Sequence, residues 1–171
     1  MIKIGPAGNT SYGKPWDDEG KDKIAQIFIS HGEEINSLQF VYVENGTSVL
    51  SEKHGGDCGP KFNVVTLDYP SEYLVGISGS YSDTSVSSIS FITNNMTYGP
   101  FGSRGGDSDS EDSDFEYHLG EDRSFGGFHG RARHYLDAIG VYLKPVTIQG
   151  DVKVNIEKHF IKKVNIKYER V

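Results

Sequence analysis

Apolar and polar residues alternate along five short segments in the first half of the chain. These segments cover residues 27–29, 38–43, 62–67, 74–77 and 89–92. Alternation with a period of two is typical of strands that bury one face of a sheet. Turn signals such as Asn45-Gly46 and Asn94-Asn95 separate the segments. The pattern therefore predicts antiparallel hairpins that follow one another in a meander.

The second half continues this pattern and, after a break, resumes it near the C-terminus. Strands are predicted at residues 115–119, 125–129 and 138–143. The acidic, serine-rich stretch 102–114 has little to bury, so we expect a solvated loop there. After Pro145 the alternation returns at residues 152–156 and 164–168, which predicts an added hairpin with its turn near residues 157–159.

The composition agrees with a single all-β domain. The 171 residues include 21 glycines, ten tyrosines and nine phenylalanines. Glycine suits tight turns, aromatic residues favour strands, and a chain of this length buries roughly 70% of its unfolded surface around one core. We expect one domain over residues 1–145 and a C-terminal basic extension over residues 146–171. The extension is expected to pack on the domain or at an oligomer interface.

The charge distribution limits the classes of partner. A net charge of −7 argues against nucleic acid, because phosphate binding needs a surplus of lysine and arginine. Residues 107–122 contain eight carboxylates and no lysine or arginine, whereas residues 151–171 carry six cations and three acids. The chain has a single cysteine, no signal-like start and no apolar run of membrane length. We expect a cytoplasmic or nucleocytoplasmic protein without a membrane partner.

Sequence motifs for catalysis or metal binding are missing. Six histidines are scattered singly, without the spacing of a metal site. The acidic run at 107–114 lacks the glycine and terminal glutamate of a calcium loop. A nucleophile elbow, a P-loop and a dinucleotide fingerprint are also absent. We therefore expect no enzymatic activity, no cofactor and no bound metal.

Several segments occur together in an order that resembles the jacalin-related lectins of plants. They are Ile4-Gly5-Pro6, Trp16-Asp17-Asp18, residues 70–79, residues 98–102 and, as the strongest match, residues 125–131 followed by 136–143. The resemblance spans roughly residues 1–145. It implies an all-β fold, a β-prism I of three four-stranded antiparallel Greek-key sheets. It also implies a homo-oligomer, a dimer or tetramer, that binds mannose- or glucose-type glycans without catalysis, in plant stress or defence.

The resemblance further implies a sugar site. In the family, a G-x-x-x-D loop before the last strand supplies a carboxylate and backbone amides, and a glycine-rich N-terminal loop closes the pocket. By position, Asp137 should accept hydrogen bonds from sugar hydroxyls, and the N–H groups of His134 and Tyr135 should donate. Gly13 should approach the ligand closely, and Tyr81 should stack on a sugar face. The alternatives are a local capping role for Asp137, an ordinary loop glycine at 13 and an isolated surface tyrosine at 81.

One residue departs from the family pattern, because Arg133 stands where the motif has glycine. If the backbone there needs a positive φ, an arginine costs about 1 kcal/mol or more, or the loop changes shape. Arg133 and His134 could also reach toward a larger or anionic glycan. If the loop keeps an open pocket, the protein is a lectin. If the Arg133 side chain fills the pocket, a jacalin-fold protein-interaction module with a vestigial sugar site is favoured, of the type associated with restricting virus spread.

Two further expectations concern specificity. The turn over residues 32–36 resembles a second G-x-x-x-D loop but ends in Asn36, so we predict no second site of comparable strength. Galactose-preferring relatives are cleaved to free an N-terminal glycine, whereas this chain is continuous through Gly13, which favours mannose or glucose. If the protein binds other proteins instead, the acidic loop or the C-terminal tail would do so.

Overall fold

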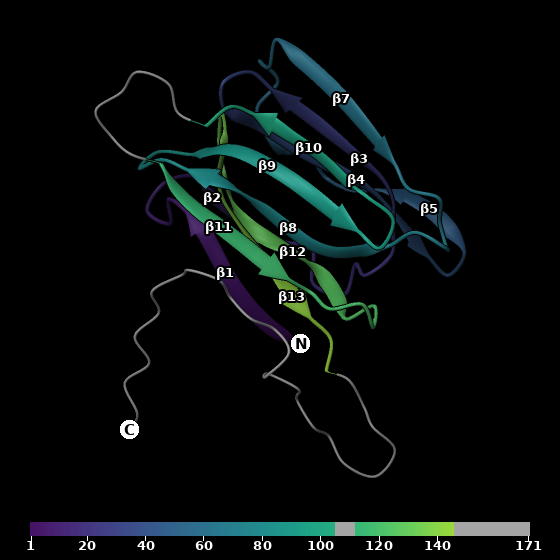
Figure 1. Ribbon diagram of the computed structural model, residues 1–171. Helices are drawn as coiled ribbons and strands as arrows, with labels where there is room; N and C mark the ends of the chain where they lie inside the picture. The colour runs from purple at the N-terminus through teal and green to yellow at the C-terminus, as the bar shows by residue number, and fades with distance from the viewer. Residues whose placement is uncertain (105–111, 146–171) are drawn as a thin grey trace, which may run out of the picture.

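Every regular element of the described chain is a β-strand. The computed structural model describes residues 1–104 and 112–145 (Figure 1), and these ranges contain no helix. The predicted all-β class is therefore confirmed. The strands are β1 (Ile2–Gly8), β2 (Lys14–Asp17), β3 (Ile24–His31), β4 (Ile35–Glu44), β5 (Thr47–Leu50), β6 (His54–Gly55), β7 (Lys61–Thr66), β8 (Leu74–Tyr81), β9 (Val86–Thr93), β10 (Thr97–Gly102), β11 (Ser113–His118), β12 (Phe125–Ala132) and β13 (Leu136–Leu143).

Five strands, β1, β2, β5, β6 and β10, have no counterpart among those predicted. Strands β2, β5 and β6 are only two to four residues long. Strands β1 and β10 each contain a Gly-Pro step, Gly5-Pro6 and Gly99-Pro100, where the pairing register shifts. Proline cannot donate to a strand ladder, and a register shift interrupts the alternation. Segments of this kind carry too little periodic signal to be predicted.

The strands form three antiparallel sheets, which confirms the expected β-prism. Sheet A has the order β1-β13-β12-β2 and joins the N-terminal strands to the last two strands. Sheet B has the order β5-β4-β3-β7, with the two-residue β6 also paired to β4. Sheet C has the order β10-β9-β8-β11. Apart from β6, each sheet has the four strands that were expected (Figure 1).

The core lies where the inner faces of the three sheets meet. Each sheet contributes one fully buried phenylalanine, Phe128 from sheet A, Phe40 from sheet B and Phe91 from sheet C. The ring of Phe128 is centred 4.8 Å from that of Phe40 and 6.5 Å from that of Phe91. Burying a side chain of this size stabilises the fold by roughly 1.5–3 kcal/mol. These rings therefore hold the three sheets together.

The hairpin turns of the three sheets repeat one arrangement. The turns join β12 to β13, β3 to β4, and β8 to β9, and each follows a register shift at the end of the first strand. The shift places Asp137, Asn36 and Ser87 in equivalent positions. A glycine with positive φ packs against the carbonyl oxygen of each, so that a Cβ on Gly8, Gly55 or Gly102 would lie within 2.3 Å of that oxygen. The backbone therefore has a pseudo-threefold symmetry that relates the three sheets.

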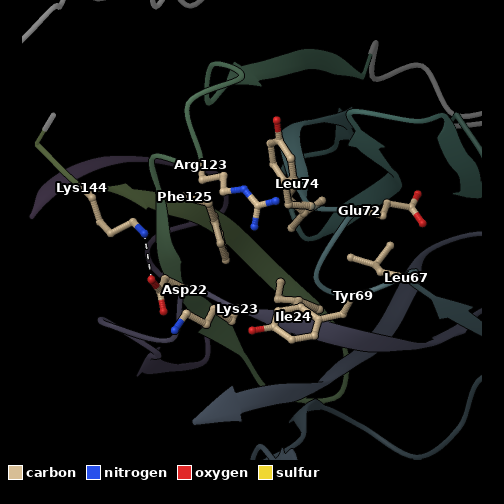
Figure 2. A pocket seen from close by; sticks show the side chains of 11 residues that line it. Asp22, Lys23, Ile24, Leu67, Tyr69, Glu72, Leu74, Arg123, Phe125 and Lys144 are labelled. Carbon is tan, nitrogen blue, oxygen red and sulfur yellow. Dashed lines mark hydrogen bonds and ion pairs between the residues drawn. The ribbon is translucent and has the colours of Figure 1, made fainter. Parts of the chain in front are cut away.

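A pocket lies at the opposite end of the strands from these turns (Figure 2). Its apolar floor comes from all three sheets, with Ile24 at the start of β3, Leu74 at the start of β8 and Phe125 at the start of β12. Lys144, which directly follows β13, lies on the rim and forms an ion pair with Asp22 at 2.8 Å. The last described residues therefore leave the domain beside this pocket.

Parts of the chain with sequence-based expectations lie outside the described residues. These are residues 105–111 of the acidic loop and the whole extension over residues 146–171, including its predicted hairpin. The domain boundary at residue 145 stays a prediction. No helix of the described ranges is long and apolar enough to cross a membrane. Within the same ranges, no three metal-binding side chains gather at one point.

Candidate functional site

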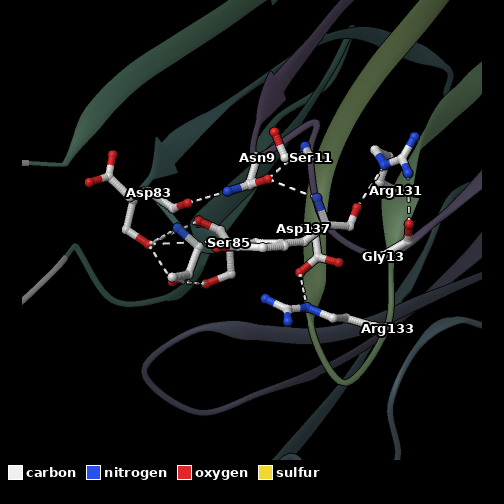
Figure 3. Close-up of polar contacts among 11 residues, drawn as sticks. Asn9, Ser11, Gly13, Asp83, Ser85, Arg131, Arg133 and Asp137 are labelled. Atoms are coloured by element: carbon white, nitrogen blue, oxygen red, sulfur yellow. Dashed lines mark hydrogen bonds and ion pairs between the residues drawn. The ribbon is translucent and has the colours of Figure 1, made fainter.

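The carboxylate of Asp137 is the centre of the candidate site (Figure 3). Asp137 is the second residue of β13, directly after the turn that joins β12 to β13. Its exposed fraction is 0%. Its Oδ1 accepts a hydrogen bond from Nε of Arg133 at 3.1 Å. Its Oδ2 is buried and accepts no hydrogen bond from the described chain. Burying an acceptor without a donor costs about 1–3 kcal/mol, so Oδ2 is an unsatisfied acceptor in this turn.

Gly13 lies directly against the unpaired oxygen. Its φ is +65°, and a Cβ at this position would lie 2.2 Å from Oδ2 of Asp137 and 2.8 Å from the carbonyl oxygen of Ala132. Only glycine fits here, both because the backbone is left-handed and because the neighbouring atoms leave no space. The structure therefore brings Gly13 and Asp137 together, as expected from the family resemblance.

The N-terminal loop is tied to the site by Asn9, which the sequence analysis did not identify. The Asn9 N–H donates to the carbonyl oxygen of Asp137 at 2.8 Å. Its side-chain Oδ1 accepts from the N–H groups of Ser11 and Tyr12, at 2.8 and 3.0 Å. Its Nδ2 donates to the carbonyl oxygen of Asp83 in the turn after β8. An asparagine followed by small polar residues is a known turn signal, and it was the available clue.

Two arginines hold the same loop from the β12 side. Arg131 donates from Nε to the carbonyl oxygen of Tyr12 at 2.6 Å and from Nη2 to that of Gly13 at 2.8 Å. The guanidinium of Arg133 lies over the Tyr12 ring, 4.5 Å from its centre. A cation over an aromatic face contributes about 0.5–1 kcal/mol at an exposed site. The loop that carries Gly13 is thus fixed by backbone and side-chain contacts.

Arg133 fits the turn without backbone strain. Within the described ranges, the non-glycine residues with positive φ are Asn45 and Arg123. The backbone at position 133 therefore does not require glycine, and Arg133 does not carry the free-energy cost of a side chain at positive φ. The Arg133 side chain folds back over the carboxylate and engages one of its two oxygens. The sequence left two alternatives, an open sugar pocket or a pocket filled by Arg133. The geometry lies between them, because Oδ1 of Asp137 is bonded to Arg133 and Oδ2 is not.

His134 and Tyr135 form the exposed tip of the turn. The Tyr135 carbonyl accepts a hydrogen bond from the Arg133 N–H at 3.0 Å, whereas no hydrogen bond of the described chain uses the N–H of His134 or Tyr135. A Cβ on Gly56 would lie 2.6 Å from the His134 carbonyl oxygen, so the segment after β6 supports the turn from its other side. The donation of both amides to a sugar stays a prediction.

Tyr81 is placed apart from these residues. It ends β8, is partly buried and packs its ring on Phe115 with 6.4 Å between ring centres. It is therefore not an isolated surface tyrosine, and no described contact joins it to Asp137. Its neighbour Asp83 reaches the N-terminal loop instead, through its carbonyl oxygen. The role of Tyr81 in stacking on a sugar stays a prediction.

A buried polar cluster positions the strand that follows Gly13. Oδ2 of Asp18 accepts from the Tyr42 hydroxyl at 2.8 Å and lies 3.0 Å from Nε2 of His54. The His54 ring stacks on Trp16 of β2 with 3.8 Å between centres. Burial, together with the Asp18 carboxylate, raises the pKa of Tyr42, so this hydroxyl stays a donor. The cluster fixes β2 against sheet B and thereby fixes the loop before it.

A model of the jacalin-like lectin domain matches residues 4–142. The chain belongs to the jacalin-like lectin family. Proteins of this family bind carbohydrate and are not catalysts, which agrees with the prediction that the chain is not an enzyme.

Relatives in plants share this domain. The chain is 42% identical over 159 residues to Protein RESTRICTED TEV MOVEMENT 1 of Arabidopsis thaliana, covering 86% of this chain and 89% of that protein. It is 41% identical over 157 residues to a mannose/glucose-specific lectin of Parkia pendula, covering 85% of this chain but only 32% of the longer relative. The family therefore includes proteins named for sugar binding and a protein named for restricted movement.

Solved structures of lectins share the fold. A mannose-binding lectin from champedak superposes with a TM-score of 0.72 at 35% identity, covering 84% of this chain and 96% of that one. Artocarpin in complex with mannotriose gives a TM-score of 0.72 at 30% identity, covering 84% and 97%. These similarities cover the prism and support its assignment to the lectin fold.

Proposed function

We propose that this lectin binds mannose- or glucose-type glycans at the Asp137 turn. The observation that carries the proposal is the buried Oδ2 of Asp137, an acceptor without a partner in the described chain. A sugar hydroxyl would supply the missing donor. A hydrogen bond to an ionised carboxylate is roughly twice as strong as one between neutral groups and is directional. The site therefore suits a ligand with hydroxyl groups.

The rest of the turn would complete the recognition. The N–H groups of His134 and Tyr135 would donate to sugar oxygens while Asp137 accepts from the hydroxyls. The Tyr135 side chain is 39% exposed and offers an apolar surface beside them. The preference for mannose or glucose is supported by the names of the Parkia and champedak lectins and by a loop that is continuous through Gly13.

Arg133 would act as a regulator of this site. Its guanidinium engages Oδ1 of Asp137 while its side chain remains 42% exposed. Because the guanidinium is partly exposed, a ligand that offers its own hydroxyl donors to the carboxylate would displace it. The freed guanidinium would then reach outward, toward a larger or anionic glycan.

The biological setting is proposed together with the site. Single sugars bind shallow sites with affinities near millimolar, about −4 kcal/mol, so useful binding calls for several sites in one particle. We propose a homo-oligomer, a dimer or tetramer, in the cytoplasm or nucleocytoplasm. A role in plant stress or defence is supported by similarity to Protein RESTRICTED TEV MOVEMENT 1.

Calorimetric titration tests the proposal directly. The protein would be titrated with methyl α-mannoside, methyl α-galactoside and a branched mannose oligosaccharide. Binding of the mannose-type ligands that is lost in Asp137→Ala but kept in Glu34→Ala is the expected result. Glu34→Ala is the matched control because it removes a carboxylate from the equivalent turn of sheet B. Absence of heat with every sugar would overturn the proposal.

A second candidate function is a jacalin-fold protein-interaction module. The contact between Arg133 and Asp137 favours it, because it occupies half of the carboxylate. In that case the acidic loop or the tail would bind a protein partner. The variant Arg133→Gly separates the two candidates, since a sugar site that appears only in this variant would show that the native site is closed.

A further inference from the structure

The outer face of sheet B carries a stripe of apolar side chains, Phe28, Val41, Leu50, Phe62 and Val64. Phe62, Leu50 and Val64 have exposed fractions of 65%, 58% and 48%. The ring of Phe62 stacks on that of Phe28, which pairs with Val64 on the neighbouring strand. Val41 pairs with Leu50 on the other side of the sheet. We name these five residues the sheet B stripe.

The other two sheets are polar on their outer faces. On sheet C, serines occupy the equivalent outer positions of β8 and β9, and Ser80 and Ser88 share a hydrogen bond at 2.8 Å. On sheet A, Lys3 and the hydroxyl of Tyr142 both bond to the carboxylate of Asp17. The sheet B stripe is therefore not a general feature of the prism surface. Phe28 also pairs with Gln39, and Val41 with Gln26, so the stripe consists of two apolar groups with these two glutamines between them on the same face. Exposed apolar groups of this kind are typical of a surface that another segment covers.

We infer that residues 152–168 of this same chain cover the sheet B stripe. In the sequence, apolar residues alternate with polar ones in two runs that would form one apolar face of a hairpin. The first run has Val152, Val154 and Ile156, and the second has Val164, Ile166 and Tyr168. A two-stranded hairpin is marginally stable alone in water, so an apolar hairpin face needs a surface to pack on.

The place where the described chain ends makes this docking reachable. Lys144 and Leu67 lie on opposite sides of the same pocket (Figure 2). Leu67 directly follows the end of β7, the edge strand that carries Phe62 and Val64. Residues 146–151 provide six residues, which can span roughly 20 Å when extended. A connection over the pocket would therefore bring the two runs to the outer face of sheet B.

Charge favours the same arrangement. Residues 33–68, which form most of sheet B and its turns, contain six carboxylates and two lysines. Residues 151–171 contain six cations and three carboxylates. Opposite charges around an apolar contact select the partner and its orientation. The net charge of the tail is thus opposite to that of residues 33–68, although Glu44 and Asp57 are already paired with lysines.

Hydrogen exchange on the full chain tests the inference. Backbone amides of residues 152–156 and 164–168 should exchange slowly, and the protection should be the same at low and high protein concentration. The double variant Phe62→Ser, Val64→Ser should reduce that protection by about tenfold or more, because it removes apolar contact at exposed positions. Val49→Ser is the matched control, since Val49 is exposed on the same sheet but pairs with the inward-facing Tyr42.

The same experiment distinguishes other occupants of the stripe. Amides of both runs that exchange as fast as an unfolded chain would overturn the inference, as would protection that the double variant leaves unchanged. Protection that falls on dilution, together with a dimer in sedimentation, would overturn docking within one chain and assign the stripe to the tail of a second copy. Because none of the variants changes the Asp137 turn, sugar binding is expected to stay the same.

Discussion

The turns of sheets A and B share one backbone frame and differ in the side chain that would meet a ligand. Asp137 and Asn36 stand at equivalent positions. A glycine packs against the backbone carbonyl oxygen of each, Gly8 against that of Asp137 and Gly55 against that of Asn36. Each turn also has a second glycine over the side chain, since a Cβ on Gly13 would lie 2.2 Å from Oδ2 of Asp137, and a Cβ on Gly59 would lie 3.0 Å from Oδ1 of Asn36. Both turns therefore have the same backbone frame, but only the turn of sheet A has a carboxylate at this position.

This difference teaches that the frame and the binding chemistry are separable. The frame needs glycines with positive φ and a register shift, which the pseudo-threefold fold supplies in both sheets. The chemistry needs a carboxylate acceptor, and of these two turns only the one with Asp137 has a carboxylate whose fully buried oxygen lacks a partner in the described chain. Changes at these positions should therefore affect binding and stability to different extents.

The largest effect is expected from Asp137→Asn. The amide has the same shape but neither the charge nor two acceptor oxygens, so sugar affinity should fall by about tenfold to a hundredfold. The free energy of unfolding should stay the same or rise, because a buried unpaired carboxylate oxygen is removed. Calorimetry and thermal unfolding measure the two quantities. A variant that still binds as tightly as the native protein would show that Asp137 does not contact the sugar.

A smaller effect is expected from Gly13→Ala. The new Cβ meets Oδ2 of Asp137, and the backbone is left-handed, so unfolding free energy should drop by about 1–2 kcal/mol and sugar binding should weaken. Gly20→Ala is the matched control, since Gly20 has a φ of +84° but no atom within 4 Å of its added Cβ. Equal losses in both variants would mean that backbone strain alone matters and that the contact with Asp137 does not.

The reciprocal change Asn36→Asp places a carboxylate in the sheet B turn. It should give a second, weaker sugar site and lower the unfolding free energy by about 1–3 kcal/mol, because a charge is introduced at a buried position. The number of mannosides bound per chain, measured in the Asp137→Asn background, is the readout. If no second site appears, the carboxylate alone does not complete the frame.

Removing the arginine is expected to shift affinity modestly. Arg133→Ala frees Oδ1 of Asp137 for a sugar hydroxyl, so methyl α-mannoside should bind about threefold to fivefold more tightly, because one hydrogen bond contributes a net of about 0.5–1.5 kcal/mol. Weaker binding in the variant would instead place the guanidinium in direct contact with the glycan. Titration of the native and variant proteins at two salt concentrations decides between them.

The smallest effect concerns pH and distinguishes the outer faces of sheets A and B. His129 of β12 occupies the position that Phe28 occupies in β3. Burial lowers the pKa of His129 below 6.5, while its Nε2 donates to the Ile4 carbonyl at 2.9 Å. The neutral ring is favoured in the fold, so stability is highest above pH 6.5 and declines as the pH falls below it. His129→Gln should remove part of that decline in unfolding measured from pH 7.5 to 5.5.

The fold could be anticipated in part from the order of residues. The alternation of apolar residues marked eight of the thirteen strands, because a strand with one buried face has a period of two. The edge strands β2 and β5 went unpredicted because they are short, and β1 and β10 because Gly-Pro steps interrupt them. Strands β1 and β2 pair with β13 and β12, far along the chain, so nothing local specifies their pairing.

The candidate site was also predicted only in part from the sequence. Asp137, Gly13 and the donors at 134 and 135 were predicted from their places in a family pattern, and the structure brings them together. Asn9 and Arg131 were missed, since both act through backbone carbonyls of residues distant in sequence. The ring of Tyr81 packs on Phe115, and its stacking on a sugar face stays a prediction.

The sequence by itself determined the strand class, the absence of catalytic motifs and the turn that carries Asp137, because period, composition and short motifs are local properties. Tertiary structure alone decided how Asp137 is used. Its burial, the unpaired Oδ2, the close approach of Gly13 and the contact with Arg133 all arise where the N-terminal loop meets the last hairpin. That meeting joins residues more than a hundred positions apart, so only the packing of sheet A could create it.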